Sequence, residues 1–239
     1  MMWKKSAGPS KADRAEASGG DIWARMTGLR QTDHMTQTPF PPAIKSRPVY
    51  GVLEQRVGTA HLIVADGEGA EAVADLVAQV QGSAAMLAVS HIIYVPGPNG
   101  TDMWAQVQAL AAAQAYRAPS IPSMMPRLQR ILTDAHMGTQ FYLAGSEGLI
   151  GQAEREIMAT GFPFSAIQKE HRGSTVRRMQ CVHCKGITEN VATDPFQCSH
   201  CGLHLFVRDH YSRRMAAFQG VNIDAEDPGR VPDPVVRFR

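Results

Sequence analysis

Two pairs of cysteines constrain this chain more than any other feature. Cys181-Val-His-Cys184 and Cys198-Ser-His-Cys201-Gly202 contain all the cysteines of the 239 residues, and residues 185–197 separate the two pairs. Each C-x-x-C pair is short enough for both thiolates to reach one ion, and the spacer is long enough to return as a β-hairpin. The pattern predicts a tetrahedral four-thiolate metal site, of zinc-ribbon or rubredoxin type, with ligands Cys181, Cys184, Cys198 and Cys201.

The spacing leaves the metal open between zinc and iron. Zinc in a closed four-sulfur site is structural, whereas iron in the same cage is a one-electron carrier. Lys185 stands where many rubredoxins have glycine, and the surroundings are basic. We favour zinc because structural zinc ribbons are common. With four thiolates present, His183 and His200 are expected to point away from the ion. Two disulfides would need an oxidising compartment, and we find no secretory signal.

Composition places the chain among globular proteins of the cytoplasm. The sequence is 44% hydrophobic and 19% charged, with no apolar run near the length of a membrane span. A net charge of +2 argues against a dedicated nucleic-acid binder. Residues 1–46 are rich in Gly, Pro, Ser, Thr and charged residues, which predicts a disordered or partner-binding arm. We keep Met35 open as an alternative to Met1 for the start of translation.

Strands and helices alternate over residues 47–172. Strands are expected at 49–55, 61–65, 84–89, 92–95, 139–144 and 167–170, where 84–89 and 92–95 are either two short strands or one interrupted strand. Helices are expected at 70–80, 101–117, 122–136 and 149–160. This alternation predicts an α/β domain with a mostly parallel, doubly wound sheet. The histidines outside the cysteine region are scattered, and no catalytic constellation follows from their spacing.

One stretch of this domain resembles a ferredoxin-reductase NAD domain. Phe141-Tyr-Leu-Ala-Gly-Ser-Glu-Gly-Leu-Ile, a helix, Gly161-Phe-Pro and Ile167-Gln-Lys-Glu-His171 match its nicotinamide-binding end. Ala144 and Ser146 stand where those reductases have cysteine and proline. At the earlier turn Asp66-Gly-Glu-Gly69, Glu68 and Glu71 would repel a pyrophosphate. We therefore expect a degenerate reductase-like scaffold with no cofactor-binding or catalytic residue.

The C-terminal third is expected to be a four-cysteine ribbon over 173–215, followed by an extended tail over 216–239. Strands are predicted at 175–180, 187–191 and 203–207, with a short helix or turn within 208–221. A ribbon this small buries little apolar surface, so the metal would supply much of its folding free energy. Arg208, Arg213 and Arg214 form either a docking site for an acidic group or a solvated cluster.

A truncated reductase-like domain is followed by C-x2-C-x13-C-x2-C-G-L, then by Asp209-His-Tyr-Ser-Arg-Arg-Met-Ala-Ala-Phe-Gln-Gly-Val and by Asp224-Ala-Glu-Asp-Pro-Gly. This combination resembles the A-subunit family of bacterial dimethylamine monooxygenase. The resemblance implies a multisubunit NADPH- and O2-dependent complex that converts dimethylamine to methylamine and formaldehyde. It places nicotinamide, flavin and iron–sulfur sites on a reductase-type subunit and oxygen chemistry on another.

We therefore expect a non-catalytic scaffold subunit of a hetero-oligomer, contacting neither membrane nor nucleic acid. A rubredoxin-type electron carrier in the same complex and a stand-alone zinc-ribbon adaptor remain as alternatives.

Overall fold

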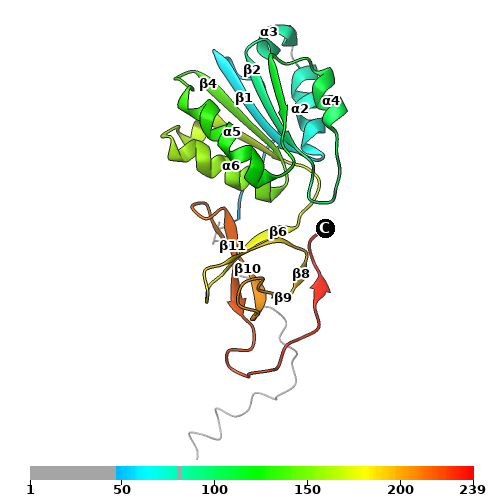
Figure 1. Cartoon of the computed structure of the whole chain (residues 1–239), viewed down its shortest axis with the longest axis vertical. Coiled ribbons are helices and arrows are strands. Elements are labelled where there is room, and N and C mark those ends of the chain that lie inside the picture. The colour runs from blue at the N-terminus through cyan, green and yellow to red at the C-terminus, as the bar shows by residue number, and fades with distance from the viewer. Residues whose placement is uncertain (1–46, 80–81) are drawn as a thin grey trace, which may run out of the picture. The chain divides into compact units, whose positions relative to one another are not determined.

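The computed structural model describes residues 47–79 and 82–239, and the described residues belong to one compact unit. The arm predicted over residues 1–46 lies outside them. Two five-stranded sheets and a two-stranded pair organise the described chain (Figure 1). The first sheet has the order β3-β2-β1-β4-β5, and the second has the order β7-β6-β11-β10-β9.

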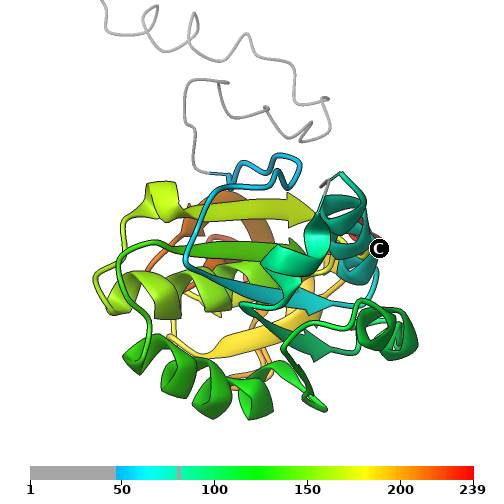
Figure 2. The same ribbon diagram turned by 90° about the horizontal axis from the view of Figure 1, so that it is seen from above.

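The first sheet is parallel throughout and confirms the predicted doubly wound α/β fold. Helices cover both of its faces (Figure 2). The strand order reverses direction between β1 and β4, which makes the ends of these two strands a topological switch point. The elements are β1 (Ala60–Asp66), α2 (Gly69–Ala78), α3 (Ser83–Leu87), β2 (Ser90–Val95), α4 (Trp104–Ala109), β3 (Gln114–Arg117), α5 (Ile121–Thr133), β4 (Thr139–Gly145), α6 (Glu147–Ala159), the 3-10 turn η1 (Phe164–Ala166) and β5 (Ile167–His171).

Strand β1 explains why the sequence reads as one apolar run here. Leu62 and Val64 pack in the cluster under α5 and α6, whereas Ile63 and Ala65 pack in the cluster under α2 to α4. A strand covered on both faces needs apolar side chains at every position. The core therefore consists of two layers of side chains, one on each face of the sheet.

Two elements of this domain differ from the prediction. The segment predicted as a strand over 84–89 is the short helix α3, because a brief apolar run fits a helix as well as a strand. The helix expected to reach residue 117 ends at Ala109. Ala111 has a positive φ of 54°, which ends the helix, and the chain then forms β3 at the exposed sheet edge. The preference of alanine for helices predicts neither event.

The strand predicted at 49–55 is an extended segment without a ladder. It lies along β5, where the amide of Gly51 donates to the carbonyl of Lys169 at 2.9 Å. Side chains accept the next bonds: the amide of Leu53 donates to the Glu170 carboxylate at 2.7 Å and that of Glu54 to Gln168 at 2.8 Å. Because side chains replace backbone carbonyls, the segment follows the sheet edge without joining the sheet.

The second sheet contains the cysteines and extends further than predicted. Its strands are β6 (Arg177–Cys181), β7 (Ile187–Val191), β9 (Phe196–Gln197), β10 (His204–Ser212) and β11 (Ala217–Asn222), and β8 (Thr193–Asp194) pairs with β12 (Val235–Val236). The helix or turn expected within 208–221 is the β10–β11 hairpin, so the boundary placed at residue 215 falls inside that hairpin. Tertiary packing explains the difference, since Leu205, Val207, Tyr211 and Phe218 pack in the ribbon core.

The hairpin also joins the ribbon to α6. Gly151 faces Tyr211, and a Cβ atom added at Gly151 would lie 2.2 Å from the Tyr211 hydroxyl. In the hairpin turn, the Arg213 guanidinium lies 4.8 Å from the ring centre of Phe164. This cation–π contact gives Arg213 a structural role within the chain, which the sequence left undecided.

Candidate metal centre

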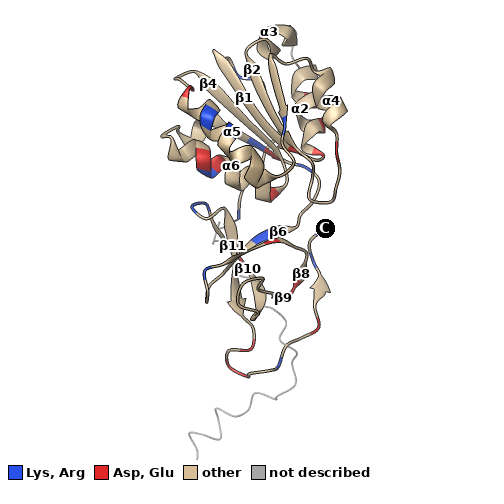
Figure 3. Cartoon of the chain, in the orientation of Figure 1, with Lys and Arg blue, Asp and Glu red and all other residues tan. Residues whose placement is uncertain are grey.

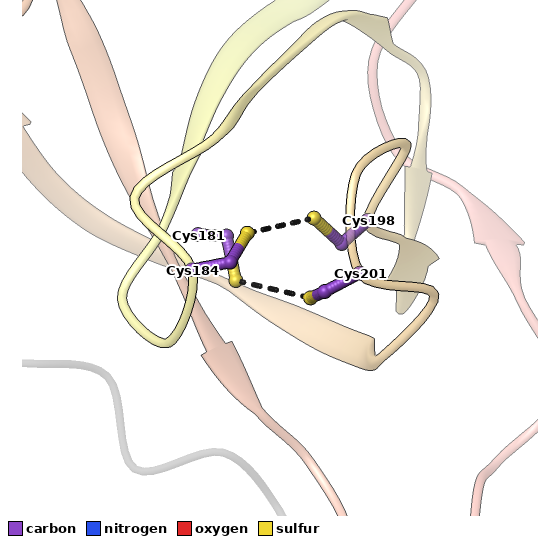
Figure 4. A group of neighbouring side chains, drawn as sticks. All are labelled: Cys181, Cys184, Cys198 and Cys201. Carbon is purple, nitrogen blue, oxygen red and sulfur yellow. Dashed lines mark hydrogen bonds between the residues drawn. The ribbon is translucent and has the colours of Figure 1, made fainter.

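The four cysteines converge from two loops of the second sheet (Figure 4). Cys181 ends β6, and Cys198 follows β9 directly. The sulfurs of Cys181 and Cys201 are 3.9 Å apart, and those of Cys184 and Cys198 are 3.7 Å apart. All four sulfurs lie within 4.8 Å of one another. The structure thus brings together every residue that the spacing predicted as a ligand.

The sulfur–sulfur distances of 3.7 and 3.9 Å match the spacing in a tetrahedral thiolate site. Metal–sulfur bonds of about 2.3 Å at tetrahedral angles place sulfurs about 3.8 Å apart. A disulfide would need about 2.05 Å, so the cysteines are free thiols. Four sulfurs would close the site around zinc or iron and leave no position for a substrate.

The two cysteine loops have the same backbone pattern. The amide of Lys185 donates to the carbonyl of Cys181 at 2.9 Å, and the amide of Gly202 donates to the carbonyl of Cys198 at 3.0 Å. Lys185 and Gly202 both have positive φ, 65° and 75°. Glycine adopts this conformation freely and lysine does not. The first loop therefore keeps the knuckle geometry despite the lysine at this position.

Two of the four thiols, those of Cys198 and Cys201, have shifted pKa values. Burial opposes ionisation of Cys198, but backbone N–H groups of Cys201 and His200 bond to its sulfur and bring its pKa down to about 6. The N–H of Leu203 favours the Cys201 thiolate, yet burial and the neighbouring thiols raise its pKa to about 12. A bound dication would offset the effects of burial and of the neighbouring thiols, because metals bind cysteines as thiolates.

The site lies close to the surface of the ribbon. Cys181 and Cys198 are buried, whereas Cys184 and Cys201 are exposed. The two histidines within the cysteine pairs are exposed as well. His200 is held by a 2.8 Å hydrogen bond between its Nε2 and the carbonyl of Ile187, which directs this ring nitrogen to the backbone.

At the carboxyl edge of the parallel sheet, acidic side chains occupy the turn where a dinucleotide binder would hold phosphate. The backbone amide and hydroxyl of Ser146 donate to the two carboxylate oxygens of Asp66, at 2.7 and 2.5 Å. Glu68 precedes α2 and accepts from the hydroxyl of Thr101 at 3.0 Å. Glu68 is placed to repel a pyrophosphate at the N-terminus of α2, whereas both oxygens of Asp66 are occupied by Ser146.

The glutamate that closes the last strand is also engaged. Glu170 is buried and accepts hydrogen bonds from the amide of Leu53 and from Arg172, at 2.7 Å each. Arg172 in turn bonds to Asp75 at 2.9 Å, which ties the end of β5 to α2. Glu170, which matches the reductase motif, therefore binds the segment that precedes β1 through Leu53 and the segment that follows β5 through Arg172.

Asp66 should make stability depend on pH. Burial raises its pKa from 3.8 to about 6, against the hydrogen bonds from Ser146. Between these two pH values the folded chain binds a proton that the unfolded chain has released, so stability falls as pH rises. We expect Asp66→Asn to gain about 3 kcal/mol relative to wild type between about pH 4 and 7. Urea unfolding of both proteins across this range tests it, and a difference independent of pH would contradict it.

A mostly parallel α/β domain joined to a β-ribbon with four converging cysteines defines the class of this protein. Both parts match one family. Residues 42–167 match the N-terminal domain, and residues 178–221 the C-terminal domain, of the family described as dimethylamine monooxygenase subunit DmmA-like. The chain belongs to this DmmA-like family.

A curated relative is the delta subunit of a heme-dependent oxidative N-demethylase from Ectopseudomonas mendocina (strain ymp). The two chains are 30% identical over 110 residues, which is 46% of this chain and 63% of the relative. The match therefore spans less than two thirds of the relative.

Solved structures with partial similarity are oxidoreductases. Phthalate dioxygenase reductase shares 14% identity over 61% of this chain and 47% of its own, with a TM-score of 0.39. The FAD/NAD-binding domain of nitric oxide dioxygenase from Vibrio cholerae O1 biovar El Tor shares 16% identity over 53% of this chain and 55% of its own, with a TM-score of 0.33. Within residues 47–79 and 82–239, no helix has the length and apolarity that a membrane crossing needs.

Proposed function

We propose that this chain is a non-catalytic subunit of an NADPH- and O2-dependent dimethylamine monooxygenase, a complex that converts dimethylamine to methylamine and formaldehyde. The observation that carries the proposal is the match of both halves of the chain to the DmmA-like family. The similarity to a delta subunit of an oxidative N-demethylase supports a role in a hetero-oligomer. Reductase-type and oxygenase-type subunits are the partners, and the cytoplasm is the compartment.

In this proposal Cys181, Cys184, Cys198 and Cys201 hold zinc, and the metal fixes the ribbon as a docking surface. A closed four-sulfur zinc site supplies folding free energy and no redox step. The contacts of Tyr211 and Arg213 with the α/β domain support a rigid platform, because they tie the hairpin to α6 and η1. The subunit would thus hold its partners in register.

The proposal assigns NADPH, flavin and iron–sulfur chemistry to partner subunits. Three carboxylates support this division. Asp66 and Glu68 occupy the phosphate turn, and Glu170 is engaged by Leu53 and Arg172. The four cysteines are the only ones in the sequence, so one four-sulfur site uses them all.

A second candidate function is electron transfer through iron bound by the same cysteines. The exposure of Cys184 and Cys201 favours it, because sulfur ligands at the surface would shorten the path to a partner's redox centre. The two candidates differ in metal and in colour, so one preparation distinguishes them.

The purified full chain tests both candidates. We expect one zinc per chain, no visible absorption and no NADPH oxidation, with dimethylamine-dependent NADPH oxidation eluting with this chain in extracts of cells grown on dimethylamine. One iron per chain, with absorption bands that bleach on reduction, would replace the scaffold by the electron carrier. NADPH-dependent turnover by the chain alone, or activity that elutes without it, would refute the proposed subunit role.

A further inference from the structure

A cavity of about 290 Å³ lies between the two sheets. On one side it meets the carboxyl ends of β1, β2 and β4 at the topological switch point. On the other side it meets β6 and β7 of the ribbon. This volume is near the lower end of small-molecule sites and too small for a whole dinucleotide. The family match does not assign a role to this cavity.

Arg178 brings N–H groups without hydrogen-bond partners to the cavity. Its side chain lines the cavity and is 13% exposed. Among the described residues, its buried Nε and Nη1 atoms have no hydrogen-bond partner. The carboxylate of Glu189 lies 3.4 Å from Nε, near enough to attract the charge, yet it forms no hydrogen bond to it. A buried guanidinium with unsatisfied N–H groups is costly unless an anion satisfies it.

The N-termini of two helices face the same space. The cavity meets the first residues of α5 and α6, each 13 residues long. A helix N-terminus presents backbone N–H groups and the positive end of the helix dipole. Gly148 lies in the first turn of α6, and a Cβ atom there would meet only the Ser146 hydroxyl, at 3.9 Å. A ligand in the cavity can therefore approach the α6 backbone closely.

The other charged groups on the cavity wall are already engaged or face solvent. Both oxygens of Asp66 accept hydrogen bonds from Ser146. Arg177 bonds to Asp209 at 2.7 Å and lies 4.1 Å from the ring centre of Phe218. Glu189 is about half exposed. The remaining capacity for binding is that of Arg178, on the basic strand β6 (Figure 3).

We propose that this cavity binds a small organic anion, a carboxylate or a phosphate ester, whose charge is received by Arg178 and the N-terminus of α6. Prolines and branched aliphatic side chains at the end of β2 and the start of α5 would contact the apolar part of the ligand. The site combines groups from both sheets, so it exists only while the ribbon is docked. It is independent of the monooxygenase assignment.

The full metal-loaded chain is tested with succinate, benzoate, glycerol 3-phosphate and nicotinamide mononucleotide, with neutral succinamide as the control. At about one hundred times Kd, a ligand of this site should raise the Tm by about 5–10 °C. It should also shift the Arg178 Nε–Hε resonance of the ¹⁵N-labelled protein. Preference for the first two compounds indicates a carboxylate, and preference for the last two a phosphate ester.

Two variants separate binding from folding. Arg178→Met should abolish the anion-dependent rise in Tm without lowering the Tm of the ligand-free chain, because a buried cation with unsatisfied N–H groups is removed. Arg130→Met, which changes an exposed arginine of α5 paired with Asp134, should keep the full response. Gly148→Leu retains Arg178, fills the cavity and should lose binding. No response to any of the four anions, or equal responses in native and Arg178→Met chains, would overturn the proposal.

Discussion

Replacing Cys198 by serine is expected to release the metal and unfold the ribbon while the α/β domain stays folded. Cys198 is both a metal ligand in the proposed site and one of the few buried residues of the ribbon core. That core contains Met179, Cys181, Val191, Phe196, Cys198, Leu205 and Phe218. So small a core cannot offset the conformational entropy of the ordered chain without the metal.

The expected effect is large because metal binding and folding are coupled. Structural zinc in zinc-finger peptides contributes about 10–16 kcal/mol of apparent binding free energy, and an incomplete ligand set loses much of it. The α/β domain has its own core on both faces of the sheet and contains none of the four cysteines. We therefore expect the loss of order to be confined to roughly residues 177–222.

Elemental analysis and limited trypsin digestion of Cys198→Ser measure the two effects. The metal content should fall below one ion per chain, and cleavage should appear at the arginines of β6 and of the hairpin turn. His183→Ala, which changes an exposed side chain inside the first cysteine pair, should keep both metal and resistance. Removal of the metal from the native chain by a chelator should reproduce the Cys198→Ser pattern. A ribbon that resists trypsin equally in all these samples would contradict the prediction.

What the sequence predicted well depends on local patterns. The positions of the cysteines are fixed by two tight loops, so their spacing alone indicated that the four sulfurs meet. Continuous apolar runs such as Leu62–Ala65 indicated buried parallel strands, because both faces of this sheet are covered. The last strand of the sheet and the two long helices α5 and α6 followed from the same kind of periodicity.

What the sequence did not predict depends on contacts between distant residues. Apolar and polar residues alternate only weakly along the hairpin of β10 and β11. Its pairing depends on the packing of Phe218 against Tyr211, whose ring centres are 5.0 Å apart. Arg178 reads as one more charge in a basic segment until β6 places it against the switch point of the other sheet. The sequence feature that came nearest to indicating a close approach to α6 was the presence of two glycines, Gly148 and Gly151, in the first turns of an otherwise good helix.

Gly151 is the residue whose substitution should separate the two sheets. We expect Gly151→Leu to displace the hairpin from α6, because even a Cβ atom at this position would lie 2.2 Å from the Tyr211 hydroxyl and 3.2 Å from the Ala216 Cβ. Overpacking of this kind costs about 1–3 kcal/mol or more. The cost would fall on the interface, since neither the parallel sheet nor the cysteine loops contain Gly151.

Two probes of urea unfolding measure this separation. Far-UV circular dichroism follows the helices of the α/β domain, and release of zinc to a chelating dye follows the ribbon. The two transitions should coincide in the native chain and separate in Gly151→Leu, with the ribbon opening first. Gly148→Leu makes the same substitution about one turn earlier in α6, where only the Ser146 hydroxyl is near, and should keep the transitions together.

A double-mutant cycle then identifies the contact that couples the two sheets. If a leucine side chain at position 151 is unfavourable because it meets Tyr211, removing that ring in Gly151→Leu/Tyr211→Ala should recover part of the lost stability, and the two substitutions should be non-additive by about 1 kcal/mol or more. Additive effects would place the coupling elsewhere. The anion site gives an independent check, because its walls come from both sheets: Gly151→Leu should lose the anion-dependent rise in Tm even though Arg178 and Gly148 are unchanged.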